Sequence, residues 1–297
     1  MINFLRVRGF VLFFTLAWMI GAATLAIYQF QKTGSVFTYS IDFTGGTQVY
    51  LRVSQPISLA IVQKRINELF PGEVIVRSVE GSDLIIRVQQ FTEATDLGAA
   101  IVAALKDTFP TVEFTLEQSE SVGPGVGESL WQKSLNAILL SMIAILFYIA
   151  LRFWSFAFST SAVLALLHDA LSILALLLFL RKAISVNVIG SIVAILGYSI
   201  NDTIVIFSQI REYMETYRGE SFYVIINKAI NKTLRRTMLT SISTALPLTI
   251  MYFFGGEALN EFSFVLLAGI IFGTFSSLFI ASPLLLLFHS YTTSKNS

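Results

Sequence analysis

Two carboxylates stand out because each lies in a segment that is otherwise almost free of charge. Asp169 follows His168 near the middle of one apolar segment, and Asp202 follows Asn201 toward the end of the next one. An ionisable side chain is costly inside a bilayer, so acids in membrane segments usually mark proton or ion pathways. The chemistry open to these residues is the uptake and release of a proton. Sodium stays open as the alternative ion, because a carboxylate among hydroxyl oxygens can bind either.

Arg236 is the cation that we expect to act on Asp202. It begins a later apolar segment, and Asp202 lies about 9 Å inside the same face of the membrane at about 1.5 Å of rise per helical residue. Protonation of the carboxylate would break such a pair. We predict a proton pathway of Asp202 and Arg236 with Asn201, His168 and Asp169. The alternative is that these side chains only join helices through hydrogen bonds.

Glycines at helical spacing form a second class of candidates. Gly190 and Gly197 fall on one helical face together with Ala194 and Asn201, and Gly269 and Gly273 are separated by three residues. Small residues at these spacings let two membrane helices approach closely. We therefore predict a helix-packing role for these four glycines.

Composition excludes most other chemistry. A soluble domain usually carries about 25% charged residues, whereas this chain of 297 residues carries 13%, and 55% of its residues are hydrophobic. There are no cysteines, which excludes disulfides, thiolate chemistry and cysteine-based metal sites, and the two histidines are too few for a zinc or haem centre without carboxylate help, so we expect no metal site. The net charge of +1 gives no electrostatic argument for nucleic acid. No phosphate-binding loop or nucleophile motif is present, so we expect a transport function rather than an enzyme, with no cofactor.

The elements that must position these residues are membrane helices. A spanning helix needs about 20 apolar residues. Six windows qualify as spans: 9–30, 134–151, 156–180, 185–207, 238–254 and 262–288. Lysine and arginine are concentrated in the segments that lie on the same side of these spans as both termini, so we expect both termini in the cytoplasm.

The sequence divides into three parts: residues 1–31 with the first span, an outer domain at 32–133, and a bundle of five spans at 134–297. The outer domain alternates between strand and helix patterns in the order βαββαβ, which is typical of a ferredoxin-like α+β domain. Its strands are expected at 47–53, 74–79, 84–88 and 112–118, and its helices at 57–70 and 93–109.

Two connecting segments carry further expectations. Residues 123–127, rich in glycine, are expected to form a stiff joint into the second span. The basic cytoplasmic loop 208–237 is expected to contain an amphipathic helix at 222–230 that lies along the membrane interface.

Several motifs, in a fixed order, carry a resemblance to a known family. They are Asp42-Phe43-Thr44-Gly45-Gly46, Gly123-Pro124-Gly125-Val126-Gly127, His168-Asp169, the stretch from Gly197 to Thr203, Arg236-Thr237 followed by Thr240-Ser241, Phe254-Gly255-Gly256, and Gly273-Thr274-Phe275-Ser276-Ser277. In these motifs and in its order of spans the chain resembles the SecF family, the smaller membrane subunit of the bacterial SecD–SecF protein-export complex.

The resemblance implies an RND-like half-bundle of six helices in the bacterial inner membrane, with the large domain in the periplasm. It implies SecD, the SecYEG channel, the translocating preprotein and membrane lipid as partners, and a role for the proton gradient in late-stage protein export. Asp202 and Arg236 fall on the family's proton pathway. Asp42, Gly45 and Gly46, with Gly123 and Gly125, are assigned to a hinge or coupling region.

Two other functions stay open at this point. One is a passive scaffold of the translocon, in which Asp202 only packs. The other is one half of an RND-type exporter of small molecules or lipids, which would need a substrate cleft in an outer domain of about a hundred residues.

Overall fold

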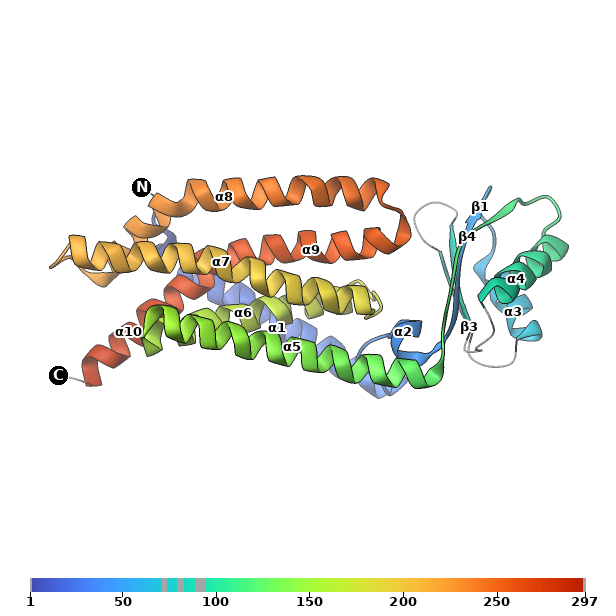
Figure 1. The fold of residues 1–297 in the computed structure, drawn as a ribbon, viewed down its shortest axis with the longest axis horizontal. Coiled ribbons are helices and arrows are strands. Elements are labelled where there is room, and N and C mark those ends of the chain that lie inside the picture. The colour runs from blue at the N-terminus through green and yellow to red at the C-terminus, as the bar shows by residue number, and fades with distance from the viewer. Residues whose placement is uncertain (1, 71–73, 79–82, 89–93, 296–297) are drawn as a thin grey trace. The chain divides into compact units, whose positions relative to one another are not determined.

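A computed structural model describes the whole chain except residues 1, 71–73, 79–82, 89–93 and 296–297 (Figure 1). The chain forms two compact units. One comprises Met1–Thr38 and Asn136–Ser297, and the other Tyr39–Leu135.

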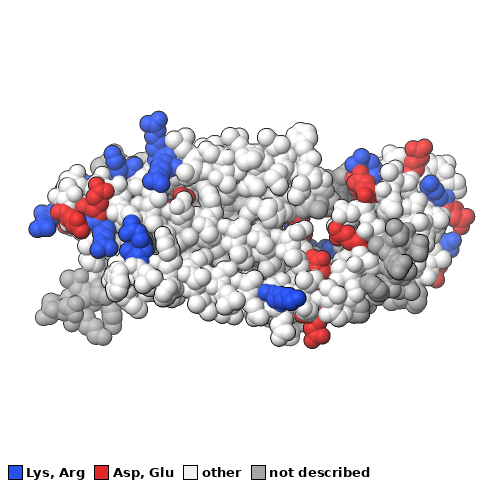
Figure 2. Space-filling view, in the orientation of Figure 1, with Lys and Arg blue, Asp and Glu red and all other residues white. Residues whose placement is uncertain are grey.

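The first unit is a bundle of long apolar helices. Six helices are long and apolar enough to cross a membrane, which confirms the six predicted spans. In chain order the elements are η1 (Phe4–Val7), α1 (Arg8–Thr33), α5 (Pro124–Phe153, which begins in the other unit), α6 (Phe156–Phe179), α7 (Val186–Thr216), α8 (Phe222–Phe254), α9 (Gly256–Ser276), the π-helical turn η2 (Ser277–Ala281) and α10 (Ser282–Lys295). The middle of this unit shows few charged side chains, and lysines and arginines gather at one end (Figure 2).

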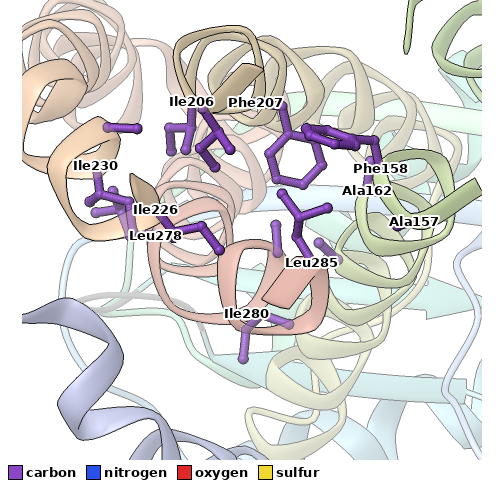
Figure 3. Packing of buried hydrophobic residues seen from close by; sticks show 14 of the residues in the cluster. Ala157, Phe158, Ala162, Ile206, Phe207, Ile226, Ile230, Leu278, Ile280 and Leu285 are labelled. Carbon is purple, nitrogen blue, oxygen red and sulfur yellow. The ribbon is translucent and has the colours of Figure 1, made fainter. Parts of the chain in front are cut away.

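The third, fourth and sixth spans form the centre of the bundle. In each of them 56% of the apolar window is buried, against 11% for the first two spans and 17% for the fifth. The main apolar cluster is built around Phe207, whose ring meets that of Phe158 edge-on at 5.3 Å (Figure 3). Ile226 and Ile230 from α8 and Leu278 from η2 join the same cluster. These three spans therefore hold the polar residues in place, while the other helices turn most of their surface outward.

The segment 208–237, expected to be a cytoplasmic loop, differs from the expectation. Helix α7 continues to Thr216 and α8 begins at Phe222, so only 217–221 connects them. Ile225, Ile226 and Ala229 are buried in the protein core, so the predicted interfacial helix is wrong. An apolar stripe at helical spacing fits a protein core as well as a lipid surface, and the sequence does not separate the two.

The sixth span is also not one regular helix. The π-helical turn η2 separates α9 from α10, and Ser282 Oγ donates a hydrogen bond to Ser277 O at 3.2 Å. Pro283 follows at once and has no N–H to give to the preceding turn. A wider turn at this point fits the missing donor, since π-turns open the backbone by one residue.

The second unit contains a four-stranded antiparallel sheet with the strand order β2-β3-β1-β4. Its elements follow the expected βαββαβ order. They are β1 (Gly46–Val53), α3 (Leu59–Leu69), β2 (Val74–Ser78), β3 (Leu84–Val88), α4 (Ala94–Thr108) and β4 (Phe114–Val122). Val49, Leu51 and Val53 alternate onto one face of β1 and pack with Ile66 and Ile101 from the two helices. The last residue of the strand expected at 74–79 and the first residue of the helix expected at 93–109 lie outside the described residues.

The glycine motif at the start of β1 has a backbone that other residues rarely adopt. After the short helix α2 (Ile41–Thr44), Gly45 and Gly46 have φ of 73° and 111°, which glycine tolerates without strain. Residues 124–127 differ from the expected joint, because they form the first turn of α5. Proline suits the first position of a helix because no partner awaits its missing N–H there. A Cβ on Gly127 would lie 2.7 Å from Phe43 O, so this turn packs directly on α2.

Candidate functional site

Asp169 is fully buried on α6 and has several hydrogen-bond partners. Ser199 on α7 donates its hydroxyl to Asp169 Oδ2 at 2.5 Å. His168 Nδ1 lies 3.3 Å from Asp169 Oδ1, and Ser172 Oγ lies 3.3 Å from His168 Nε2. The Ser276 hydroxyl at the end of α9 also acts on this carboxylate by hydrogen bonding. Asp169 therefore joins three central helices at one point.

Two glycines of α9 allow this close approach to α7. A Cβ on Gly273 would lie 2.9 Å from the Cβ of Ser199, and a Cβ on Gly269 would lie 2.1 Å from Ile195 Cδ1. Real Cβ contacts are essentially never that short. The small side of α9 thus faces α7 at the level of the Asp169–Ser199 bond, as membrane helices with small residues pack.

Gly190 and Gly197 lie on a different face. A Cβ on either one would meet no neighbouring atom within 4 Å. Both are exposed, as are Ala194 and Asn201 on the same helical stripe. The stripe of Gly190, Ala194, Gly197 and Asn201, here called the α7 stripe, is exposed in the described part of the chain.

Asp202 lies one turn after Ser199 on α7 and is 3% exposed. Its Oδ2 is buried and, within the described residues, has no hydrogen-bond partner. From α8, Thr240 acts on the carboxylate by hydrogen bonding and Arg236 through its charge. The two charged groups are close enough to interact, but among the described side chains no ion pair within 4.0 Å joins them. Arg236 itself is exposed.

A row of hydroxyl groups lies beside Asp202 between α7, α8 and α9. Tyr198 donates to Ser241 Oγ at 3.1 Å, and Ser241 Oγ lies 2.7 Å from Thr274 Oγ1. Thr237 Oγ1 is buried and has no partner in the described part of the chain. Unpaired Asp202 and Thr237 oxygens beside a hydroxyl row are suited to accept and pass on a proton.

Sequence reasoning assigned no role to these hydroxyls or to Ser199. The available signal was helical spacing, because Ser199 precedes Asp202 by about one turn, and Thr240 and Ser241 follow Arg236 by about one turn. Thr237 comes directly after Arg236. Serine and threonine are common in membrane helices, so spacing alone does not select them. Asp169 does come together with α7, but it bonds Ser199 rather than Asp202, while His168 lies beside Asp169 and Ser172 on its own helix.

In the other unit, Asp42 lies at the base of the sheet. Ser40 caps α2 and donates its hydroxyl to Asp42 Oδ2 at 2.9 Å. Burial, together with the negative charge of Asp42, raises the pKa of Glu120 on β4 above its ordinary value of 4.5. Gln118 donates to Glu120 Oε1 at 2.6 Å. The region around Asp42 thus holds two acids, of which Glu120 resists ionisation.

Among the described residues, no three His, Cys, Asp or Glu side chains are grouped so that they could hold a metal ion.

Two family models match the chain. The model described as the C-terminal part of the SecD/SecF protein export membrane protein matches residues 100–291, and the SecD/SecF GG motif matches residues 34–57. The second match includes Gly45 and Gly46.

Curated relatives and solved structures agree with these matches. The protein translocase subunit SecF of Calditerrivibrio nitroreducens is 36% identical over 280 residues, which cover 93% of this chain and 92% of the relative. The SecF subunit of Pseudomonas aeruginosa is 34% identical and covers 96% of this chain and 90% of its own.

The crystal structure of SecDF from Thermus thermophilus, a translocon-associated membrane protein, matches with a TM-score of 0.84 at 30% identity over 97% of this chain. A second SecDF structure, in a super-membrane-facing form, matches with a TM-score of 0.69. The chain spans about two fifths of the solved SecDF chains, at 39% and 40% of their lengths. On the family model and these relatives, we conclude that the chain is a multi-pass membrane protein of the SecF family of protein translocase subunits.

Proposed function

We propose that this protein uses the proton gradient, together with SecD, to promote late-stage protein export across the bacterial inner membrane. The observation that carries the proposal is Asp202. Its buried carboxylate has an oxygen without a partner and faces the charge of Arg236 and the hydroxyl of Thr240 across two helices. Because the chain belongs to the SecF family of protein translocase subunits, we infer that this site serves protein export.

The step that we propose at this site is a change in the contact between α7 and α8. When Asp202 is ionised, its charge attracts Arg236 and the Thr240 hydroxyl toward α7. When a proton binds at Oδ2, the charge is lost, the attraction weakens, and α8 is free to move. The proton is then released to the other side of the membrane. We propose that Asp169 acts beside this step by fixing Ser199, and that His168 and Asn201 line the pathway.

We propose that SecD covers the α7 stripe. The four residues of the stripe are exposed, and Asn201 lies one position before Asp202 in the middle of an apolar helix. An amide turned toward lipid would be costly, whereas a small-residue face with one amide is what a second membrane helix needs for close packing. The SecDF structures are named for a protein that contains both parts, which supports SecD as the occupant.

The remaining parts of the proposal concern orientation and partners. Both termini lie in the cytoplasm and the sheet domain in the periplasm, where it contacts the preprotein that leaves SecYEG. The hinge around Asp42, Gly45 and Gly46, with Gly123 and Gly125, couples that domain to the bundle, which lipid surrounds. The coupling ion is the proton, with sodium as the alternative, and neither a cofactor nor nucleic acid takes part.

The decisive experiment is release of a secretory protein from spheroplasts that carry this protein with SecD. Wild type, Asp202→Asn and the surface control Asp107→Asn are compared at equal abundance, each with the gradient intact and collapsed. We expect Asp202→Asn to reduce release to the level of the collapsed gradient, and Asp107→Asn, whose side chain is 78% exposed, to behave as wild type. Normal release by Asp202→Asn would refute the proton site and favour a passive scaffold. A gradient of sodium in place of protons distinguishes the two ions.

A further inference from the structure

The first residues of the chain lie along the cytoplasmic half of α8 and are held there by side-chain amides. Asn231 Oδ1 accepts from Ile2 N at 2.9 Å, and Asn231 Nδ2 donates to Ile2 O at 2.7 Å. Asn227 Oδ1 accepts from Phe4 N at 2.9 Å, and Asn227 Nδ2 donates to Asn3 Oδ1 at 2.7 Å. The Tyr223 hydroxyl donates to the same Asn3 oxygen at 2.8 Å. We call residues 2–5 the N-terminal strap.

The strap is also buried. Leu5 is 1% exposed and Phe4 is 6% exposed, and both belong to the main apolar cluster of the bundle. The ring of Phe4 lies 5.6 Å from that of Phe279 in the π-helical turn η2. The strap therefore contacts α8 by hydrogen bonds and η2 by apolar packing, so it connects these two elements.

The amide pair makes the attachment specific. Asn227 and Asn231 are four residues apart, so they lie on one face of α8. Asn231 uses both its carbonyl and its amide group on the backbone of one residue, as a neighbouring strand would. Asparagine is a weaker helix former than alanine or leucine, and most of the two side chains' hydrogen bonds go to the strap. Packing alone would not call for amides here.

The strap is attached to α8 about one and a half to two and a half helical turns before the groups that act on Asp202. Arg236 follows Asn231 by little more than one helical turn, and Thr237 and Thr240 come next on α8. On the other contact, η2 follows directly after Ser276, which acts on Asp169. The strap includes the first half of η1 (Phe4–Val7), which leads without a break into α1. The strap thus ties α1 to the half of α8 that carries Arg236.

We propose that the N-terminal strap is a positioning element, which holds α8 at the place where Arg236 and Thr240 face Asp202. The effect of the strap on export rests on the proposed function, but its effect on the position of α8 does not. The absence of cysteine from the chain makes both testable with single introduced thiols.

The first test measures the position of α8 without reference to export. In the full chain in membranes, Thr237→Cys, at a site 1% exposed, reports on α8, and Ser263→Cys, at a site 0% exposed, reports on α9. Each is labelled with a membrane-permeant thiol reagent in three backgrounds: wild type, Asn227→Ala with Asn231→Ala, and Asn260→Ala. Asn260 is the matched control because its amide also bonds the α8 backbone, at Tyr252 O, but far from the strap along the helix.

We expect labelling at position 237 to rise about tenfold or more when both strap asparagines are removed, because several net-favourable hydrogen bonds are lost together. Labelling at 263 and in Asn260→Ala should stay low. Unchanged labelling at 237 would overturn the proposal, and so would an equal rise at both positions, which would mean loss of packing throughout the bundle. Asn3→Ala, which removes bonds from the strap side only, is the milder second variant.

The second test asks whether position matters for export. Asn3→Cys with Asn227→Cys breaks the amide contact, and a short thiol crosslinker can restore the tether. We expect gradient-dependent release to fall in the uncrosslinked pair and to recover on crosslinking, with Asn260→Ala near wild type. Normal release without the tether would overturn the positioning role. If Asp202→Asn is found to release normally, the proton site fails, and the strap is then judged by labelling at position 237 alone.

Discussion

At the scale of single residues, the two buried acids of the bundle differ in how far their oxygens are satisfied. Asp169 is bonded on both oxygens, by Ser199 on one and His168 on the other. Asp202 keeps an oxygen without a partner in the described part of the chain. A buried polar group without a partner is costly and calls for a reason, whereas a fully bonded one can serve as a fixed joint. This difference supports the proposal that Asp202 exchanges the proton and that Asp169 fixes the helices.

Ser199→Ala tests the fixed joint. Removing this hydroxyl leaves a buried oxygen of Asp169 without its donor, which costs about 1–3 kcal/mol. Ser191→Ala is the control, because Ser191 donates to backbone carbonyls at Asn187 and Phe262. The apparent melting temperature of the protein in detergent, at one heating rate, should fall further for Ser199→Ala than for Ser191→Ala. An equal fall in melting temperature would mean that the bond from Ser199 to Asp169 stabilises the protein no more than the bonds from Ser191 to backbone carbonyls.

Glu120 gives a prediction about pH. Its raised pKa means that, just above pH 4.5, the folded domain holds a proton that the unfolded chain has released. Stability of the sheet domain therefore falls as pH rises through this window, and the penalty is full at neutral pH. Glu120→Gln cannot ionise, so it should be more stable than wild type at neutral pH and similar to it near pH 4.

Trp131 can report on this domain alone, because its ring lies 5.2 Å from Tyr39 and 5.3 Å from Phe43. Fluorescence during denaturant unfolding is followed with the other tryptophans, at positions 18 and 154, replaced by phenylalanine. Glu117→Gln is the control, since Glu117 is paired with Arg52 at the surface. A gain for Glu120→Gln that persists unchanged near pH 4 would argue against the assigned cause.

At the scale of elements, α7 and α9 approach each other closely at Gly269, where an added Cβ would lie 2.1 Å from Ile195 Cδ1. We expect Gly269→Ala to destabilise the isolated chain by about 1–3 kcal/mol, because the new methyl group collides with Ile195. Gly190→Ala, which meets open space, should be neutral or slightly stabilising by about 0.5–1 kcal/mol. Thermal unfolding in detergent checks both. Similar effects of the two substitutions would contradict the packing.

Helix positions followed from hydropathy, because a span needs a long apolar run whatever it packs against. The helix ends could not be predicted from hydropathy, because both helices extend beyond their apolar stretches into polar sequence. Helix α7 ends at Thr216 and α8 begins at Phe222. The site followed in part. Acids in apolar segments can be found by inspection, but the bond from Ser199 to Asp169 depends on how α6 and α7 are rotated, which no local pattern fixes. The same holds for Gly190 and Gly269, which have similar sequence contexts and opposite surroundings.

At the scale of the whole molecule, the exposed α7 stripe has the small residues that a partner helix needs for close packing. We predict that Gly197→Leu leaves the isolated chain as stable as wild type, because nothing lies within 4 Å of the site. It should reduce co-purification with SecD by filling the space needed by a partner helix. Gly9→Leu on α1, which also meets open space, is the matched control. Undiminished recovery of SecD with Gly197→Leu would place the partner on another face.

The π-helical turn in the sixth span has a genetic consequence. A π-turn holds one residue more than an α-helical turn, so losing one residue of Ser277–Ala281 would let this segment close into a regular helix while α10 keeps its orientation. The same loss elsewhere in the span would turn all that follows by about 100° and rotate Leu285, now fully buried, out of the core. Single-codon deletions among functional descendants of this gene should therefore fall at this turn and not elsewhere in α9 or α10.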